Sequence, residues 1–147
     1  MFKKHPVLCS IIAAAVAVII FQLFWGIAVV SGNSMSPYYE DGDLVLFNKR
    51  EKPEKNQVVV AYVGDKYVIK RIVAVQGDVI TICDNILLIN GEEQGNVDSD
   101  GDDREESITL VENQYFLMGD NRGKSKDSRI YGVVYRCQII GVVARVL

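Results

Sequence analysis

The only histidine of this chain, His5, lies among the first six residues and is followed by a long uncharged segment. It is therefore separated from the polar body of the chain, which excludes a serine–histidine or cysteine–histidine pair there. A serine can also be activated by a lysine that is held in its neutral form. Ser34 and Lys70 have the residue types that this second chemistry needs.

Lys70 lies in a strongly apolar stretch, residues 67–73. Side chains alternate between the two faces of a strand, so Lys70 shares a face with Val68 and Ile72, while Arg71 points to the other face. An ammonium group on an apolar face is desolvated, which lowers its pKa and makes a neutral amine available near pH 7. From the strand alone, a lysine that reaches solvent from an edge strand is the simpler interpretation.

Two further polar segments contain residue types that can support a site. Pro37 lies three residues after Ser34. Proline disfavours a helical conformation in the residue before it, here Ser36, so this segment is predicted to be a loop or strand end. Residues 119–129 are rich in Gly, Asp, Asn and Ser, which is also typical of ordinary turns. In that simpler interpretation, Asp127 and Arg129 form a surface ion pair.

Residues 7–30 carry no charge and are apolar except at three positions, Ser10, Gln22 and Gly26. As one helix they would rise about 36 Å, which exceeds the ~30 Å hydrocarbon core of a bilayer. The segment is longer than the ~7–15-residue core of a cleaved signal peptide. A buried helix of this length needs a larger domain than the rest of the chain supplies. We therefore predict a retained transmembrane anchor over residues 7–30.

The basic residues around the anchor predict its orientation. Lys3 and Lys4 precede it, whereas the first cation after it is Lys49. The positive-inside rule then places residues 1–6 in the cytoplasm and residues 31–147 outside the membrane.

The residues after the anchor make one domain of ordinary size with an acidic balance. From residue 31 onward there are 14 basic and 19 acidic residues, a net charge of −5. This balance argues against nucleic acid as a partner, because nucleic-acid binding calls for a basic face. Cys83 and Cys137 lie outside the anchor, and they could either pair or remain free thiols.

Strand signals dominate this domain. Short runs of β-branched and aromatic residues alternate with turn dipeptides such as Gly64-Asp65 and Asp84-Asn85. They predict strands at residues 58–63, 67–75, 79–83, 86–89, 108–111, 114–118, 131–135 and 138–146. We expect a mainly β fold, a compact folded antiparallel β-sheet or barrel, behind one N-terminal transmembrane helix.

Residues 92–106 contain eight acidic residues and are predicted to form a solvated loop. Four polar residues here fall on ligand positions of an EF-hand loop: Asn96, Asp98, Asp100 and Asp102. Ser107 replaces the glutamate that such a loop needs at its last position, and no flanking helices are predicted. We therefore expect no metal site.

Three segments follow the anchor in order. They are Gly-Asn-Ser-Met-Ser-Pro at 32–37, Tyr-Val-Ile-Lys-Arg-Ile-Val at 67–73, and Met-Gly-Asp-Asn-Arg-Gly-Lys-Ser-Lys-Asp-Ser-Arg at 118–129. Together they resemble the type I signal peptidases, the membrane-bound serine peptidases that remove signal peptides from exported proteins. The resemblance covers nearly the whole chain, and its third segment is the most specific.

This resemblance implies that Ser34 is the nucleophile and Lys70 its general base, and a lysine at that position is typical of the bacterial type. It also implies supporting residues around the lysine amine: Ser125, whose hydroxyl would hold the amine, the bracing pair Asp127 and Arg129, and the turn residues Asp120 and Asn121. No cofactor or metal is expected.

The resemblance also carries expectations about the substrate. Some members of the family have an oxyanion-hole serine at the position of Gly32, so here the hole would rest on backbone N–H groups, chiefly that of Ser34. Substrates with small residues at the first and third positions before the cleaved bond are implied. The expected pocket walls, chosen by position only, are Met35, Ile69 and Val30.

The expected partners are signal-peptide-bearing preproteins and the lipid bilayer of a bacterial cell, crossed once. Two alternatives remain. A self-cleaving Ser-Lys peptidase of the same fold would be soluble and bind DNA, which suits an acidic, anchored chain poorly. A membrane-tethered β-domain that binds a protein partner without catalysis would not need Ser34, Lys70 and Ser125 together.

Overall fold

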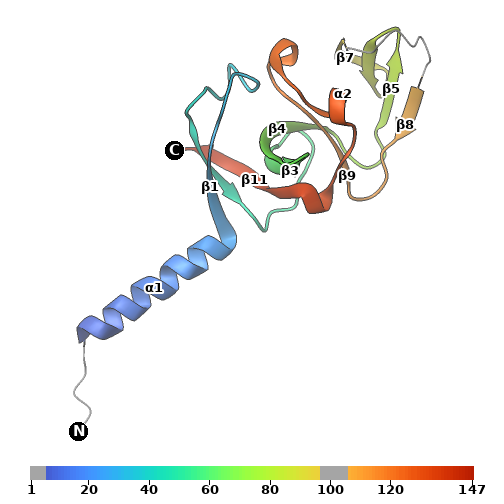
Figure 1. Ribbon diagram of the computed structural model, residues 1–147. Helices are drawn as coiled ribbons and strands as arrows, with labels where there is room; N and C mark the ends of the chain where they lie inside the picture. The colour runs from blue at the N-terminus through green and yellow to red at the C-terminus, as the bar shows by residue number, and fades with distance from the viewer. Residues whose placement is uncertain (1–5, 97–105) are drawn as a thin grey trace.

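The computed structural model describes residues 6–96 and 106–147. His5, Lys3 and Lys4 lie outside the described residues. So do residues 98–102, which include three of the four residues compared with an EF-hand loop. The described residues form one long helix, eleven strands and three short helical segments, and every strand pairing is antiparallel. The mainly β prediction is confirmed (Figure 1).

The N-terminal apolar segment is divided between a helix and a strand. The helix α1 spans Pro6–Phe24, and the next five residues form β1, Trp25–Val29. The prediction of one helix over residues 7–30 is therefore wrong at its C-terminal end. Over residues 6–96 and 106–147, no helix combines the length and the apolar character needed to cross a membrane.

The strand β1 forms because it completes one edge of a sheet. It pairs along its whole length with β2, Leu44–Asn48. Gly26 lies opposite Phe47, whose ring occupies the space that a Cβ at position 26 would need. Periodicity cannot separate a short apolar strand from the last turns of an apolar helix, which explains the error.

Seven strands form the larger sheet, in the order β1-β2-β11-β3-β4-β9-β10. Its remaining strands are β3 Val58–Val63, β4 Lys66–Ala74, β9 Gln114–Met118, β10 Val134–Tyr135 and β11 Ile139–Val146. The predicted hairpin of β3 and β4 is confirmed, with Val63 opposite Lys66 across its turn.

The smaller sheet has the order β7-β6-β5-β8. Its strands are β5 Val79–Cys83, β6 Ile86–Ile89, β7 Glu92–Asn96 and β8 Glu106–Thr109. The prediction of a loop over residues 92–106 is therefore wrong at both of its ends. Asn90 and Gly91 both have positive φ, 54° and 84°, which closes a tight hairpin between β6 and β7 despite the acidic side chains. Charged residues on an edge strand also discourage pairing with another chain.

Three short helical segments connect the last strands: η1 Arg122–Lys124, α2 Ser128–Tyr131 and η2 Arg136–Gln138. The strand predicted at residues 131–135 is confirmed only for β10. Tyr131 belongs to α2 instead, because the Asp127 side chain caps this helix. Cys137 is an exposed free thiol in η2 and is not joined to Cys83.

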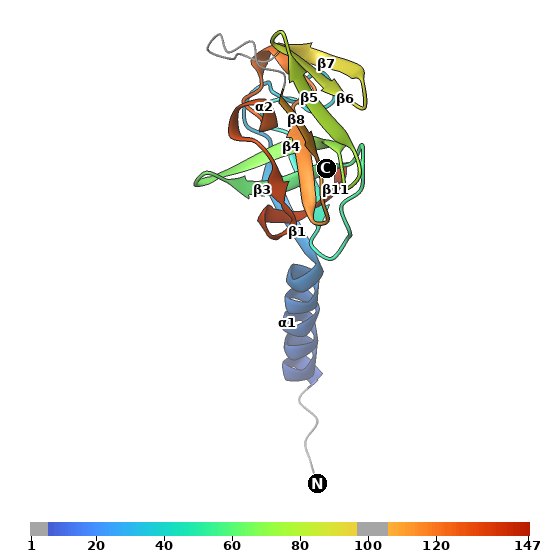
Figure 2. The same ribbon diagram turned by 90° about the vertical axis from the view of Figure 1, so that its right-hand side faces the viewer.

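Two apolar clusters pack on the two faces of β9. Leu117 belongs to a cluster within the larger sheet, and Phe116 and Met118 belong to a cluster that includes residues of the smaller sheet. The strand β9 is thus fixed from both sides, and the loop that follows it starts from a rigid base. Figure 2 shows α1 projecting away from both sheets.

Candidate active site

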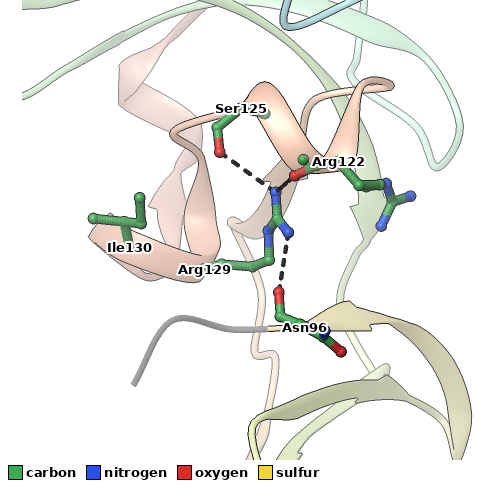
Figure 3. A pocket seen from close by; sticks show the side chains of 6 residues that line it. Asn96, Arg122, Ser125, Arg129 and Ile130 are labelled. Atoms are coloured by element: carbon green, nitrogen blue, oxygen red, sulfur yellow. Dashed lines mark hydrogen bonds between the residues drawn. The ribbon is translucent and has the colours of Figure 1, made fainter. Parts of the chain in front are cut away.

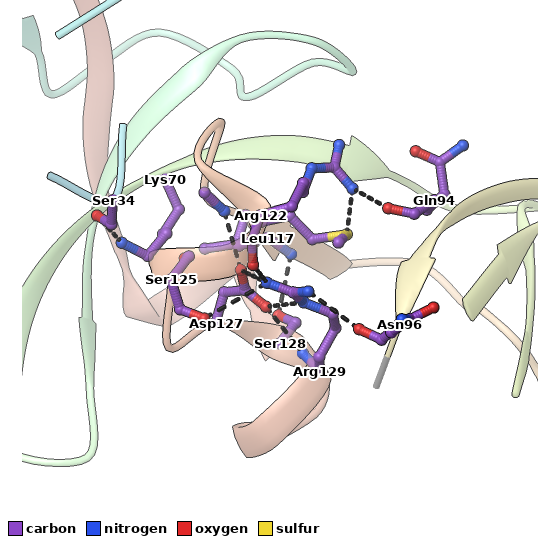
Figure 4. Close-up of polar contacts among 12 residues, drawn as sticks. Ser34, Lys70, Gln94, Asn96, Leu117, Arg122, Ser125, Asp127, Ser128 and Arg129 are labelled. Carbon is purple, nitrogen blue, oxygen red and sulfur yellow. Dashed lines mark hydrogen bonds and ion pairs between the residues drawn. The ribbon is translucent and has the colours of Figure 1, made fainter. Parts of the chain in front are cut away.

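Ser34 and Lys70 meet although 36 positions separate them in the sequence. Ser34 lies in the turn after β1, and Lys70 lies in the middle of β4. The Nζ atom of Lys70 donates to Ser34 Oγ at 2.7 Å (Figure 4). It also donates to the Ile69 carbonyl at 3.1 Å. The two residues selected from the sequence as a nucleophile–base pair are therefore in direct contact.

The Lys70 side chain is buried, with 5% of its surface exposed. It shares its face of β4 with half-buried Val68 and fully buried Ile72, as the strand alternation predicts. Burial lowers the pKa of Lys70 below its ordinary value, while the negative charges of Asp127 and Asp120 oppose this effect. The interpretation of Lys70 as a solvated edge-strand lysine is wrong.

The turn that carries Ser34 is held on both sides. Within the turn, Tyr39 N–H donates to the Met35 carbonyl at 3.1 Å. From outside, Asn121 N–H donates to the Ser34 carbonyl at 3.0 Å. Gly119 packs so closely here that a Cβ on it would overlap the Ser34 carbonyl and the Ser125 side chain. The loop after β9 thereby fixes the position of the serine backbone.

Asp127 and Arg129 form a buried ion pair. Asp127 is fully buried, and Arg129 donates to its two carboxylate oxygens from Nε at 2.9 Å and from Nη2 at 3.0 Å. Gly119 N–H donates to the same carboxylate at 3.0 Å. Burial pushes the pKa of Asp127 up, but the hydrogen bonds of Arg129 and Gly119 outweigh it, and the pKa lies below its ordinary value. A surface ion pair is thus the wrong description.

Arg129 also connects the loop to the smaller sheet. Its guanidinium donates to the Arg122 carbonyl at 2.6 Å and to the Asn96 carbonyl, at the end of β7, at 3.0 Å. These residues line a pocket of about 340 Å³ together with Gly123, Ser125 and Ile130 (Figure 3). The role of Asn96 was not predicted, because residues 92–106 gave no strand signal that would place it here.

The Ser125 hydroxyl is buried and, among the described residues, has no hydrogen-bond partner. It lies close enough to Asp127 to lower the pKa of that carboxyl, but outside hydrogen-bond geometry. The expected hydrogen bond between Ser125 and Lys70 is therefore not formed in this structure.

A second ion pair, between Arg71 and Asp120, was missed by the sequence analysis. Arg71 donates to both Asp120 carboxylate oxygens, from Nε at 2.8 Å and from Nη2 at 2.7 Å, and to the Asn56 carbonyl at 2.7 Å. The hydrogen bond to Asp120 raises the pKa of Arg71. The pairing of β4 with β9 sets Arg71 opposite Met118, two residues before Asp120. A correct strand pairing would have indicated this contact.

The three expected pocket residues differ in exposure. Val30 and Met35 are buried, with 3% and 1% of their surfaces exposed, and Ile69 is half-buried. In residues 6–96 and 106–147, no group of three acidic, histidine or cysteine side chains could hold a metal ion.

Comparisons with known proteins place this chain in a family. Residues 4–147 match the family model described as signal peptidase, peptidase S26. Signal peptidase IB of Staphylococcus aureus (strain COL) is 31% identical, over 96% of this chain and 89% of that protein. Signal peptidase I of Bacillus amyloliquefaciens is 31% identical, over 95% of this chain and 86% of that protein.

A solved structure of a signal peptidase I from Enterococcus faecalis V583 is 25% identical, with a TM-score of 0.46, and the match covers 63% of this chain and 97% of that one. The family match extends over almost the whole chain, and both relatives are 31% identical to it. The chain therefore belongs to the type I signal peptidases of peptidase family S26, which are serine endopeptidases.

Proposed function

We propose that this chain removes N-terminal signal peptides from exported preproteins through a catalytic dyad of Ser34 and Lys70. The observation that carries the proposal is the 2.7 Å distance between Lys70 Nζ and Ser34 Oγ, at a lysine that is buried on an apolar face. A buried amine loses its proton more easily than a solvated one, and only the neutral amine can accept the serine proton.

In the proposed reaction, neutral Lys70 accepts the hydroxyl proton of Ser34 as Oγ attacks the scissile carbonyl carbon. The resulting ammonium then gives this proton to the leaving amine, and an acyl-enzyme ester remains on Ser34. Lys70, neutral again, takes a proton from water, and the hydroxide attacks the ester. Lys70 returns its proton to Ser34 Oγ as the ester C–O bond breaks, and the released carboxylic acid loses its own proton to solvent.

The negative oxygen of the tetrahedral intermediate needs hydrogen-bond donors. We assign this role to backbone N–H groups of the Ser34 turn, chiefly that of Ser34 itself. Gly32 has a φ of 79°, a conformation that side chains rarely adopt, which supports a hole without a side-chain donor at that position. Asn121 and Gly119 hold this turn through the contacts described above.

We further propose that α1 tethers the peptidase domain to the bilayer of a bacterial cell, with the N-terminus in the cytoplasm and the domain outside. The apolar side chains of α1 are exposed; Val7, Ile11, Ile19 and Leu23 are each more than half exposed. Water would solvate such a surface poorly, whereas acyl chains would cover it. Ser34 lies ten residues beyond the end of α1, which would bring the dyad close to the membrane surface.

The test is cleavage of a labelled preprotein by the detergent-solubilised chain. Ser34→Ala and Lys70→Ala should each lower the rate by roughly 10³-fold or more. Ser31→Ala and Lys66→Ala are matched controls, because both side chains are exposed and lie near the dyad residues in sequence. The dyad assignment is wrong if Lys70→Ala keeps near-wild-type turnover. Cleavage of the chain itself, with the preprotein left intact, would instead identify a self-cleaving peptidase.

A further inference from the structure

A groove of about 520 Å³ lies where α1 meets the larger sheet. Val18 and Phe21 of α1 form one wall, and Trp25 and Ile27 of β1 form the other. Lys49, the first residue after β2, completes the lining. The walls are thus apolar, with a cation beside them, and no step of the proposed reaction uses the groove.

Two cations are attached to the last turn of α1. Lys49 Nζ donates to the Gln22 carbonyl at 2.8 Å, and Lys49 N–H donates to the Phe24 carbonyl at 2.8 Å. The guanidinium of Arg50 lies over the Phe24 ring, 5.7 Å from its centre. An ammonium group has three N–H donors, so Lys49 can contact the helix and still bind an anion.

A third cation follows from the sheet register. Ile27 pairs with Leu46 on β2, and Leu46 pairs with Arg145 on β11. Paired residues of neighbouring strands direct their side chains to the same face. Arg145, which is exposed, therefore lies on the same outer face of the larger sheet as Ile27, and Ile27 lines the groove.

One acidic residue, Glu51, offsets part of the positive charge at this edge. Glu51 follows Arg50 in the sequence, and its carboxylate accepts a hydrogen bond from Gln57 Nε2 at 2.9 Å. Within the described residues, α1 carries no charged side chain at all. The three cations Lys49, Arg50 and Arg145 outnumber the one carboxylate of Glu51, so the junction of helix and sheet carries a net positive charge.

We propose that this groove binds one anionic phospholipid. Its acyl chain would lie against Val18, Phe21 and Ile27, and its phosphate would contact Lys49 and Arg50. A lipid fits better than free phosphate, because the apolar walls continue into the exposed apolar surface of α1 and the cations lie where that surface ends. The inference rests on the proposed tethering of α1 to a bilayer.

Trp25 gives a direct readout, because it lines the groove and is the only tryptophan of the chain. The full chain is placed in phosphatidylcholine vesicles that contain either brominated phosphatidylglycerol or brominated phosphatidylcholine, and the quenching of Trp25 fluorescence is measured. We expect phosphatidylglycerol to associate about fivefold more strongly for each cation that contacts its headgroup. Lys49→Gln with Arg50→Gln should reduce this preference to near one, and Arg145→Gln should reduce it less.

The matched control is Lys66→Gln, an exposed lysine on β4, which should leave the preference unchanged. Cleavage of a preprotein in detergent by the double variant verifies that it is folded. Equal quenching by both lipids would contradict the proposed site for an anionic phospholipid, but it would agree with the proposed tethering of α1 to the bilayer. An equal loss of preference in Lys66→Gln would overturn the assignment to Lys49 and Arg50. Absence of quenching by either lipid would overturn the tether and this site, but not the dyad.

Discussion

Burial of Lys70 is the residue-scale property on which the proposed reaction depends. Desolvation favours the neutral amine, whereas Asp127 and Asp120 favour the charged form. Both carboxylates have their own cations, Arg129 and Arg71 respectively, and this reduces their hold on the lysine proton. The two ion pairs thus allow acidic residues near the dyad without returning the lysine to its ordinary pKa.

The first prediction concerns the pH dependence of this amine. Because burial lowers the pKa of Lys70, the neutral fraction and the activity should rise with pH through a value below the ~10.4 of a solvated lysine. The acid limb of kcat/KM for a soluble peptide substrate measures it, with Trp25 fluorescence as a check that the fold persists. An acid limb at about 10.4 would contradict the desolvation argument.

The second prediction concerns Ser125. Its hydroxyl is buried without a hydrogen-bond partner among the described residues, so Ser125→Ala should leave the free energy of unfolding unchanged or slightly higher. If the hydroxyl holds the lysine during the reaction, kcat should still fall about tenfold or more, since a hydrogen bond to a charged group contributes about 1.5–3 kcal/mol. Thermal unfolding and kcat are measured together, with Ser31→Ala as control. Unchanged kcat and pH profile would remove Ser125 from the site.

At the scale of elements, the site is built by the strands β4 and β9 and by the loop between β9 and α2. The strand β4 carries Lys70 on one face and Arg71 on the other, so a single strand contacts both the serine turn and Asp120. The loop after β9 carries Asp120 and also contacts the serine turn, through the hydrogen bond from Asn121 N–H to the Ser34 carbonyl. Gly119 stands at the point where strand and loop meet.

The third prediction is that Gly119→Ala impairs catalysis. A Cβ at this position would overlap the Ser34 carbonyl, a backbone atom, so the serine turn must shift. A displacement of about 1 Å at a reacting group can lower the rate by 10²-fold. Gly123→Ala is the control, because nothing lies within 4 Å of a Cβ there. Wild-type kcat in Gly119→Ala would show that the serine turn does not depend on this close contact.

The sequence predicted the elements whose signals are local. The hairpins of β3 with β4 and of β5 with β6 follow from alternating apolar runs and from turn dipeptides with positive φ, such as Asp84-Asn85. Three strands, β1, β2 and β7, were missed. For β1 and β7 the pairing partners, rather than their own residues, determine the structure, whereas β2 was not predicted although its own residues 44–47 are apolar. Lys70 and Ser34 were selected through a family resemblance, whereas the Arg71–Asp120 contact required the pairing of β4 with β9.

At the scale of the whole molecule, the boundary between helix and peptidase domain differs from the sequence-based one. The domain begins at β1, because this strand pairs with β2 over five residue pairs. Val30 also binds the domain, since its N–H donates to the Asp43 carbonyl at 2.8 Å and its carbonyl accepts from Gly42 N–H at 2.9 Å. The segment of residues 25–30 thus leads directly into the Ser34 turn and supports it.

The last prediction compares two truncations of the chain. Removal of residues 1–24 deletes α1 but keeps β1, so the remaining chain should be folded and should cleave a soluble peptide at a rate close to that of the full chain. Removal of residues 1–30, the boundary expected from the sequence, also deletes β1 and the Val30 hydrogen bonds. It leaves β2 as an unpaired edge and frees the backbone before Ser34, which should lower both the unfolding temperature and kcat. Thermal unfolding and peptide cleavage are measured side by side, with the full chain in detergent as the reference. Equal stability and equal kcat for the two truncations would show that β1 is part of the anchor and that the serine turn is held by the β9 loop alone.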